Sequence, residues 1–130
     1  MTRWVGAWGP AAGWAAFLFF LSSRPSVGVA LPFGADKVAH FGAYLVLGFL
    51  LAHGVTRFGL SARFALVVGM LYGLSDEVHQ RFVPGRSAEL ADWIADALGA
   101  VAGILVYLFL LRVRADRSDR AARAALEGSP

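Results

Sequence analysis

The sequence contains no cysteine and little charge, and each shortage excludes a class of protein. Without cysteine the chain has no disulfide framework, no thiolate nucleophile and no cysteine-ligated zinc or iron–sulfur site. Of the 130 residues, 16% are charged and 58% hydrophobic, whereas soluble domains are about 25% charged and about 45–50% apolar. A soluble chain of this length would need more polar surface than average, not less. The composition therefore argues against an ordinary soluble domain and predicts a protein embedded in lipid.

The spacing of the charged residues predicts where the chain crosses the membrane. Residues 4–23 contain no ionisable group, and residues 38–56 contain only two histidines. Both runs provide the roughly 20 residues that a helix needs to cross a bilayer. Residues 64–75 and 97–111 are shorter, so each has to be extended through acidic residues at one end. The predicted spans are residues 4–22, 37–56, 64–83 and 93–111.

The predicted fold is therefore an all-α membrane protein, an antiparallel bundle of four transmembrane helices that forms a single domain over residues 1–111. Residues 112–130 are expected to form a basic helical tail with a disordered end at residues 127–130. A cleaved signal peptide is the alternative for the first span. Against it, Arg3 is the only basic residue before the apolar stretch, which Trp, Gly and Pro interrupt.

Lysine and arginine are distributed unequally between the two sides of this bundle. The side of the two termini and the second loop has eight of them, and the opposite side has four. Because cytoplasmic segments are enriched in lysine and arginine, both termini are expected to be cytoplasmic. No nucleic-acid partner is expected, since three acids offset the five arginines of the tail and no aromatic residues alternate with them. Membrane lipids are the expected partners of this basic tail.

The remaining ionisable residues fall into three clusters that the predicted topology places on the outer side. They begin the second span, end the third span, and occupy the third loop with the start of the fourth span. Spacing of i,i+4 aligns Asp36, His40 and Tyr44 along one helix face, and it also pairs Asp76 with Gln80 and Asp92 with Asp96. Ionisable groups within a membrane bundle usually face its interior and mark a functional site.

The residue types in these clusters favour binding or acid–base chemistry on an anionic head group. Crowded carboxylates near a low-dielectric boundary can retain a proton at neutral pH, and His40 beside Asp36 is suited to act as an oriented general base. Arginine and lysine supply cations for phosphate. The candidate catalytic residues are His40, Asp76 and Glu77, and the candidate substrate-binding residues are Asp36, Lys37, Tyr44, Gln80, Arg86, Asp92 and Asp96.

Several of these residues also have a purely structural interpretation. The structural alternatives are a helix cap for Asp36, an i,i+4 ion pair of Glu77 with Arg81, a first-turn acid at Asp92, and interhelical hydrogen bonds from Tyr44 and Tyr72. Asp96 is harder to explain in this way. It lies one turn below Asp92 at the start of an apolar run, where an unpartnered carboxylate is costly.

No cofactor and no metal ion are expected. Ligands from His40, His79 and the acids are conceivable, but the sequence has no His-Glu-x-x-His motif. Lys37 and Arg86 would also compete with a metal ion for the same carboxylates.

Three stretches carry a family resemblance: DKVAHFGAY at residues 36–44, SDEVHQRFVPGR at 75–86 and DWIADALG at 92–99. Together they resemble the VanZ-like family of small bacterial membrane proteins, over roughly residues 36–103. The middle stretch is the most specific of the three. The third has Asp96 where the family usually has Asn, which adds a possible negative charge.

The resemblance implies a multi-pass protein of the bacterial plasma membrane, active at the outer face of the envelope and linked to resistance against glycopeptide antibiotics of the teicoplanin type. Three function classes follow: a protein that binds a lipid-linked cell-wall precursor, an enzyme that modifies such a head group, and a small transporter. Transport is disfavoured because His53 is the only ionisable residue in the central and inner parts of the spans. A homo-oligomer is possible, since small-residue faces around Gly6, Gly13 and Gly99 can pack within or between protomers.

Overall fold

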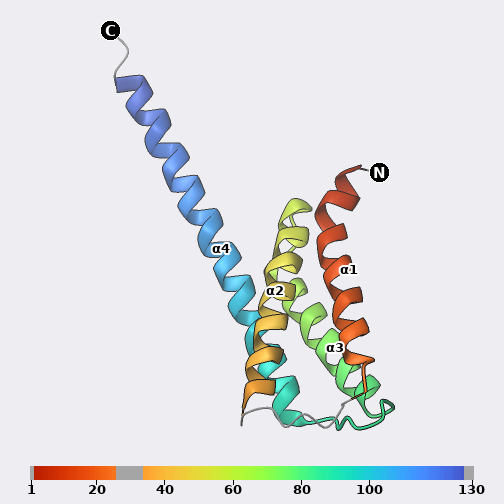
Figure 1. Cartoon of the computed structure of the whole chain (residues 1–130). Helices are drawn as coiled ribbons and strands as arrows, with labels where there is room; N and C mark the ends of the chain where they lie inside the picture. Colours follow the sequence, from red (N-terminus) through yellow and green to blue (C-terminus); the bar gives the residue numbers. More distant parts are fainter. Residues whose placement is uncertain (1, 26–33, 128–130) are drawn as a thin grey trace.

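Four α-helices contain most of the residues that the computed structural model describes, 2–25 and 34–127 (Figure 1). The helices are α1 (Thr2–Ser22), α2 (Ala35–Arg57), α3 (Ala62–Gln80) and α4 (Leu90–Glu127). The described residues include no β-strand, so the prediction of an all-helical protein is confirmed. By length and composition α1, α2 and α4 are able to cross a membrane. The helix α3 is not among them, because it includes Arg63, Asp76 and Glu77.

Two helix boundaries differ from the predicted ones around the loop between α3 and α4. The helix α3 ends at Gln80 rather than at residue 83, because the N–H groups of Phe82 and Val83 donate to the carbonyls three residues back. These bonds form tight turns, and Gly85 then adopts a φ of 76° that favours glycine. The helix α4 begins at Leu90 rather than at residue 93, because the carbonyl of Glu89 accepts the first helical hydrogen bonds.

The helices α2 and α4 pack backbone against backbone. A Cβ placed on Gly48 would overlap the backbone of Ala100, and a Cβ on Gly99 or Gly103 would overlap the backbone of α2 at Phe41 or Leu45. Glycine is therefore required at all three positions if the helices are to approach this closely. Gly99 thus packs within the protomer, whereas no described atom lies within 4 Å of a Cβ placed on Gly6 or Gly13.

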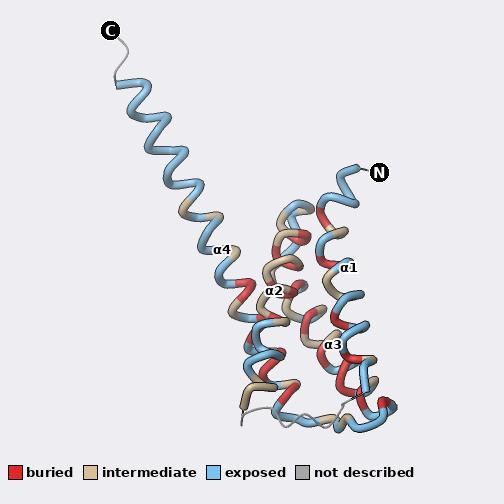
Figure 2. Tube along the Cα trace, viewed as in Figure 1, coloured by how far each residue is buried: buried red, intermediate tan, exposed pale blue. Residues whose placement is uncertain are grey.

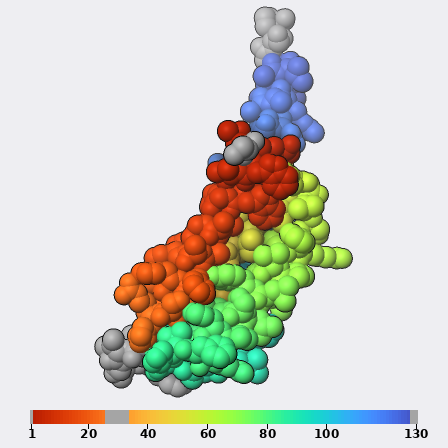
Figure 3. Space-filling view, turned by 90° about the vertical axis from the view of Figure 1, so that its right-hand side faces the viewer, coloured from red at the N-terminus to blue at the C-terminus, as the bar shows by residue number. Residues whose placement is uncertain are grey.

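Polar side chains attach α1 to the other helices. Trp14 Nε1 donates to the carbonyl of Ala43 on α2 (2.9 Å), and the Tyr72 hydroxyl on α3 donates to the carbonyl of Ala15 (2.5 Å). Between α1 and α3 the surface is hollowed, and part of α2 is visible at the bottom of the hollow (Figure 3). This hollow contains an apolar cavity of about 360 Å³ lined by side chains of α1, α2 and α3.

The second half of α4 extends well beyond the bundle (Figure 2). The last buried residue of α4 is Ile104, and the helix continues without interruption to Glu127. The expected helical tail is therefore present as the end of α4. Of the segment expected to be disordered, Glu127 is helical and residues 128–130 lie outside the described residues.

Replacement of Gly103 by alanine tests the contact between α2 and α4. Because the new Cβ would overlap the backbone of Leu45, we expect Gly103→Ala to lower the free energy of unfolding by about 1–3 kcal/mol. The matched control is Gly42→Ala on the exposed side of α2, where nothing lies within 4 Å of the added atom. Thermal unfolding of both variants in detergent measures the difference. Equal stability of the two variants would contradict the proposed role of Gly103.

Candidate functional site

The polar residues of the three clusters converge at one end of the bundle. The start of α2, the end of α3 and the start of α4 meet there, next to the end of α1. The described chain buries six polar or charged residues, and all lie at this end: Ser22, Asp76, Glu77, Gln80, Asp92 and Asp96. The burial of four carboxylates in so small a volume requires compensating partners.

Lys37 compensates one group of carboxylates, which we call the outer cluster: Asp36, Glu89 and Asp92. Its Nζ lies 2.7 Å from Asp36 Oδ2 and 2.8 Å from both Glu89 Oε2 and Asp92 Oδ1. One ammonium group thus joins α2, the loop before α4 and α4 itself. Because Lys37 is 2.8 Å from its carboxylate, the pKa of the exposed Glu89 is lowered.

The structure contradicts the interpretation of Asp36 as the cap of the second helix. Gly34 occupies the N-cap position with a φ of 80°, and no side chain caps the helix there. Asp36 lies in the first turn and accepts from its neighbour Lys37. Its carboxylate is therefore committed to the outer cluster.

The partner of His40 is Asp96, not Asp36 as the sequence analysis expected. His40 Nδ1 lies 2.8 Å from Asp96 Oδ1, across the contact between α2 and α4. A carboxylate can only accept, so Nδ1 is the donor in this pair and Nε2 is free to accept or donate elsewhere. The side chain of Asp96 is 1% exposed. This is the arrangement in which a carboxylate orients a histidine for acid–base chemistry.

Glu77 connects α3 to the loop before α4. Its Oε2 accepts from the backbone N–H of Glu89 at 2.8 Å. The i,i+4 ion pair with Arg81 is not formed among the described residues, so that structural interpretation of Glu77 is wrong. The backbone bond uses one carboxylate oxygen, and the other, Oε1, is buried without a hydrogen-bond partner in the described part of the chain.

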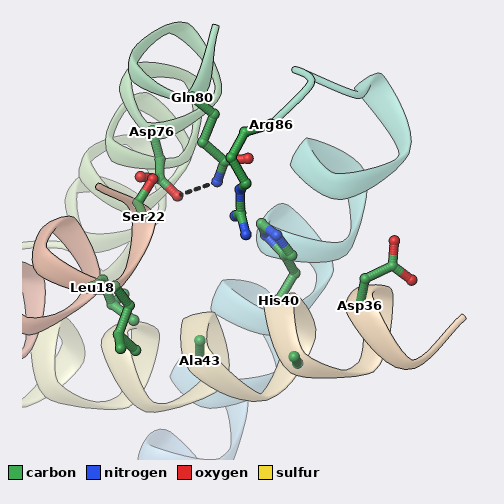
Figure 4. A pocket seen from close by; sticks show the side chains of 10 residues that line it. Leu18, Ser22, Asp36, His40, Ala43, Asp76, Gln80 and Arg86 are labelled. Carbon is green, nitrogen blue, oxygen red and sulfur yellow. Dashed lines mark hydrogen bonds between the residues drawn. The ribbon is translucent and has the colours of Figure 1, made fainter. Parts of the chain in front are cut away.

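Beside these groups lies a pocket of about 230 Å³ (Figure 4). Gln80 Nε2 donates to Asp76 Oδ2 at 3.2 Å in its wall. The guanidinium of Arg86, which comes from the loop between α3 and α4, reaches across the pocket toward His40. No described residue forms a salt bridge with Arg86. The pocket therefore presents an arginine that no carboxylate of the described chain neutralises.

The predicted site residues occupy three positions relative to this pocket. Those that line it are Asp36, His40, Asp76, Gln80 and Arg86. Lys37 and Asp92 belong to the outer cluster, whereas Glu77, Asp96 and Tyr44 are buried near His40 without lining the pocket. Of the two tyrosines, Tyr72 makes the expected interhelical bond and Tyr44 does not, since its buried hydroxyl has no partner among the described residues.

The contribution of α1 to this pocket was not predicted from the sequence. Leu18, Leu21 and Ser22 form part of the wall, and the Ser22 hydroxyl is buried without a described partner. The only available signal was the position of Ser22 at the end of a span that reaches the same side as the polar clusters. His79, by contrast, does not line the pocket, and its Nε2 is hydrogen-bonded to the Ser23 hydroxyl at 3.0 Å.

Two groups of described side chains have the geometry to hold a metal ion. In the first, ligand atoms of His40, Glu77 and Asp96 all lie within 4.8 Å of one another. The second group is the outer cluster, whose carboxylates surround the ammonium of Lys37. The absence of a metal site remains a prediction of the sequence analysis.

Comparison with known proteins identifies a family to which the chain is similar. The model of a family described as VanZ/LLP1 matches residues 7–112. The match includes most of α1, all of α2 and α3, and the part of α4 that packs in the bundle, so every residue of the pocket falls within it. No curated protein and no solved structure matches the chain.

Replacement of Lys37 by glutamine tests the outer cluster. Removal of the ammonium leaves the buried Asp92 uncompensated, so we expect the free energy of unfolding at neutral pH to fall by about 1–3 kcal/mol. The pH dependence should change as well. With its pKa lowered in the folded state, Glu89 contributes stability above its unfolded pKa near 4.5, and this is lost as the pH falls through the folded pKa.

The wild-type protein should therefore lose stability as the pH falls below about 4.5, and Lys37→Gln should lose less over the same range. Thermal unfolding in detergent as a function of pH measures both effects. Arg81→Gln is the control, since Arg81 is exposed and forms no salt bridge with a described residue. Identical pH profiles for the wild type and Lys37→Gln would refute this role of Lys37.

Proposed function

The chain belongs to the VanZ/LLP1 family, and from this membership and the pocket we propose that it binds the phosphate-bearing head of a membrane amphiphile, such as a lipid-linked cell-wall precursor. The single observation that carries the proposal is the guanidinium of Arg86, which reaches into the pocket and has no salt bridge with any described residue. Arginine binds phosphate through two parallel hydrogen bonds, a geometry that lysine cannot provide.

Lys37, the other cation among the candidate substrate-binding residues, is already paired with carboxylates. Lys37 contacts three carboxylates and is not among the residues that line the pocket. Nε2 of His40 and the unpartnered hydroxyl of Ser22 add two further groups that can donate to a phosphate oxygen. An anion in the pocket would thus meet the guanidinium of Arg86 and these two further groups. The carboxylates of Asp36 and Asp76 also line the pocket, but each already accepts a hydrogen bond, Asp36 from Lys37 and Asp76 from Gln80.

The surroundings of the pocket favour an amphiphile over a free anion. Leu18 and Leu21 of α1 line one side of the pocket, and the apolar cavity between α1 and α3 begins one turn further along α1, at Ala15. A ligand with its phosphate at Arg86 could therefore place its hydrocarbon chain against α1 and α3. Burial of such a chain is favourable by about 0.8 kcal/mol for each CH₂.

We further propose that all four helices cross the plasma membrane in antiparallel order, with both termini cytoplasmic and the pocket at the outer face. The feature of α3 that supports this is a stripe of exposed apolar residues with helical spacing, Phe64, Val67, Leu71, Leu74 and Val78, which are 47–60% exposed. Such a stripe is costly in water and suited to contact with lipid. The acids of α3 that count against a span lie on its buried side, at the end beside the pocket.

A second candidate function is enzymatic modification of the bound head group. The specific observation in its favour is the short hydrogen bond between His40 and the buried Asp96, with His40 at the wall of the pocket. A histidine oriented in this way can transfer a proton to or from a phosphate ester or its leaving group. The two functions share one site. They differ in whether the bound amphiphile is chemically changed.

Replacement of Arg86 by glutamine tests the binding proposal. Native mass spectrometry of the purified protein in mild detergent should detect a bound phosphate-bearing amphiphile in the wild type, with occupancy at least about tenfold lower in Arg86→Gln, since a charge-assisted hydrogen bond is worth about 1.5–3 kcal/mol. Arg81→Gln is the matched control. It removes an exposed arginine from the same end of the protein that is not part of this pocket.

Failure to find such an amphiphile in the wild type, or equal losses in the two variants, would contradict binding at Arg86. If the protein is an enzyme, the mass of the bound amphiphile changes on incubation, and His40→Ala stops the change while the amphiphile remains bound. An unchanged mass in the wild type would contradict the enzymatic alternative.

The lack of cysteine allows a direct test of the proposed topology, because single cysteines can be introduced without a background. Ser87 in the loop before α4 and Ser118 in the projecting part of α4 are both exposed. In intact cells a membrane-impermeant maleimide should label Ser87→Cys and not Ser118→Cys, and permeabilised cells should show labelling of both. Labelling of Ser118→Cys alone in intact cells would invert the orientation, and labelling of both would exclude the four-span topology.

A further inference from the structure

At the wall of the pocket lies a group of side chains that we call the inner triad: the partly buried His40 and the buried Glu77 and Asp96. One potential ligand atom from each lies within 4.8 Å of those of the other two. The three residues come from α2, α3 and α4, so the bundle assembles the triad from three separate segments. Glu77 is 5% exposed and Asp96 is 1% exposed, which places both carboxylates in a medium where charge is costly unless it is paired.

The hydrogen bonds within the described chain leave this triad incomplete. Asp96 Oδ1 is paired with His40 and Glu77 Oε2 with a backbone N–H, but Asp96 Oδ2 and Glu77 Oε1 are buried with no partner among the described residues. A further buried hydroxyl without a described partner belongs to Tyr44, which lies one turn from His40 on α2. Its ring and Asp96 Oδ2 both approach within 3.3 Å of a Cβ built on Gly73. Unsatisfied polar atoms at this depth call for a bound group.

The two nearby cations do not fill this need. Lys37 lies 2.7–2.8 Å from the carboxylates of the outer cluster, and no salt bridge joins it or Arg86 to Glu77 or Asp96 in the described chain. The competition expected from Lys37 is therefore found at the outer cluster and not at the inner triad, and Arg86 forms a salt bridge with neither group in the described chain. The inner triad therefore consists of two carboxylates and one histidine, with no lysine or arginine paired to it in the described chain.

From this geometry we propose that the inner triad binds a divalent transition-metal ion. One imidazole nitrogen and two carboxylate oxygens form a donor set that suits Mn²⁺, Fe²⁺ or Zn²⁺, whereas Ca²⁺ and Mg²⁺ favour oxygen ligands alone. Three protein ligands leave coordination positions open for water or another ligand. Because His40 also lines the pocket, the ion would lie next to a molecule bound there.

The metal site does not depend on the amphiphile, and its test uses Mn²⁺ alone. The full-length protein in detergent is stripped with a chelator and titrated with MnCl₂, and the free ion is measured by electron paramagnetic resonance. We expect one ion for each chain. Asp96→Asn and Glu77→Gln preserve the shape of the side chains and each remove a charged ligand, so each should weaken Mn²⁺ binding by at least about 100-fold.

Glu89→Gln is the matched control, because it removes a carboxylate of the outer cluster, which is the other group with metal-binding geometry. It should bind Mn²⁺ as the wild type does. Absence of binding by the wild type at millimolar Mn²⁺ would overturn the proposal, as would an equal loss in Glu89→Gln and Asp96→Asn. Circular dichroism of each variant verifies that its helices are intact.

The wild-type protein provides a second test that requires no variant. Bound Mn²⁺ should show electron spin-echo modulation from an imidazole nitrogen, and a bound ion without this modulation would contradict the assignment to His40. Arg86→Gln separates this inference from the proposed function. The variant should retain Mn²⁺ binding whether or not it has lost the amphiphile, because Arg86 is not part of the inner triad.

Discussion

The close contact between α2 and α4 is the constraint on which the rest of the structure depends. Because Gly99 and Gly103 allow their backbone to meet that of Phe41 and Leu45, the rotation and register of the two helices are fixed together. His40 precedes Phe41 and Asp96 lies one turn before Gly99, so the same register brings these two side chains to 2.8 Å. The site is thus a consequence of backbone packing that takes place deeper in the bundle.

Within that framework the carboxylates divide into two groups with different compensation. Around Lys37 the negative charges are matched by a cation whose Nζ lies within 2.8 Å of three carboxylates, and this cluster connects the loop before α4 to α2. Among the described residues, Glu77 is bonded only to a backbone N–H and Asp96 only to His40, and the second oxygen of each has no partner there. The arrangement around Lys37 stabilises the folded protein. The arrangement of Glu77 and Asp96 lowers the stability of the fold, because buried oxygens are left without hydrogen bonds. Such a cost is expected at positions whose residues serve binding and not folding.

Much of the fold could be predicted from the sequence because lipid imposes a simple rule on charge. The charge-free runs located all four helices, with the facing ends of α3 and α4 each misplaced by three residues at a turn built from backbone hydrogen bonds. The convergence of three polar clusters followed from the topology. Which carboxylate pairs with His40 could not be predicted from the topology, because Asp36 lies one turn away on the same helix and Asp96 lies on a neighbouring helix. The rotation of the helices about their axes decides between the two partners. Ser22 carries no charge, so only its position at the end of the first span indicated that it could reach the pocket.

The helices α2 and α4 are packed more closely than α1 and α3, and this difference indicates where a ligand would reach the pocket. The backbone contact of α4 with α2 leaves no space between them, whereas α1 and α3 flank a hollow and are joined there by the bond from Tyr72 to the carbonyl of Ala15. A lipid tail could enter from the bilayer through this hollow while its head group reached Arg86. A water-soluble ligand would leave the apolar cavity of about 360 Å³ beside the pocket unfilled. The apolar cavity therefore favours an amphiphile, and the guanidinium of Arg86, which has no salt bridge in the described part of the chain, favours a phosphate as its head group.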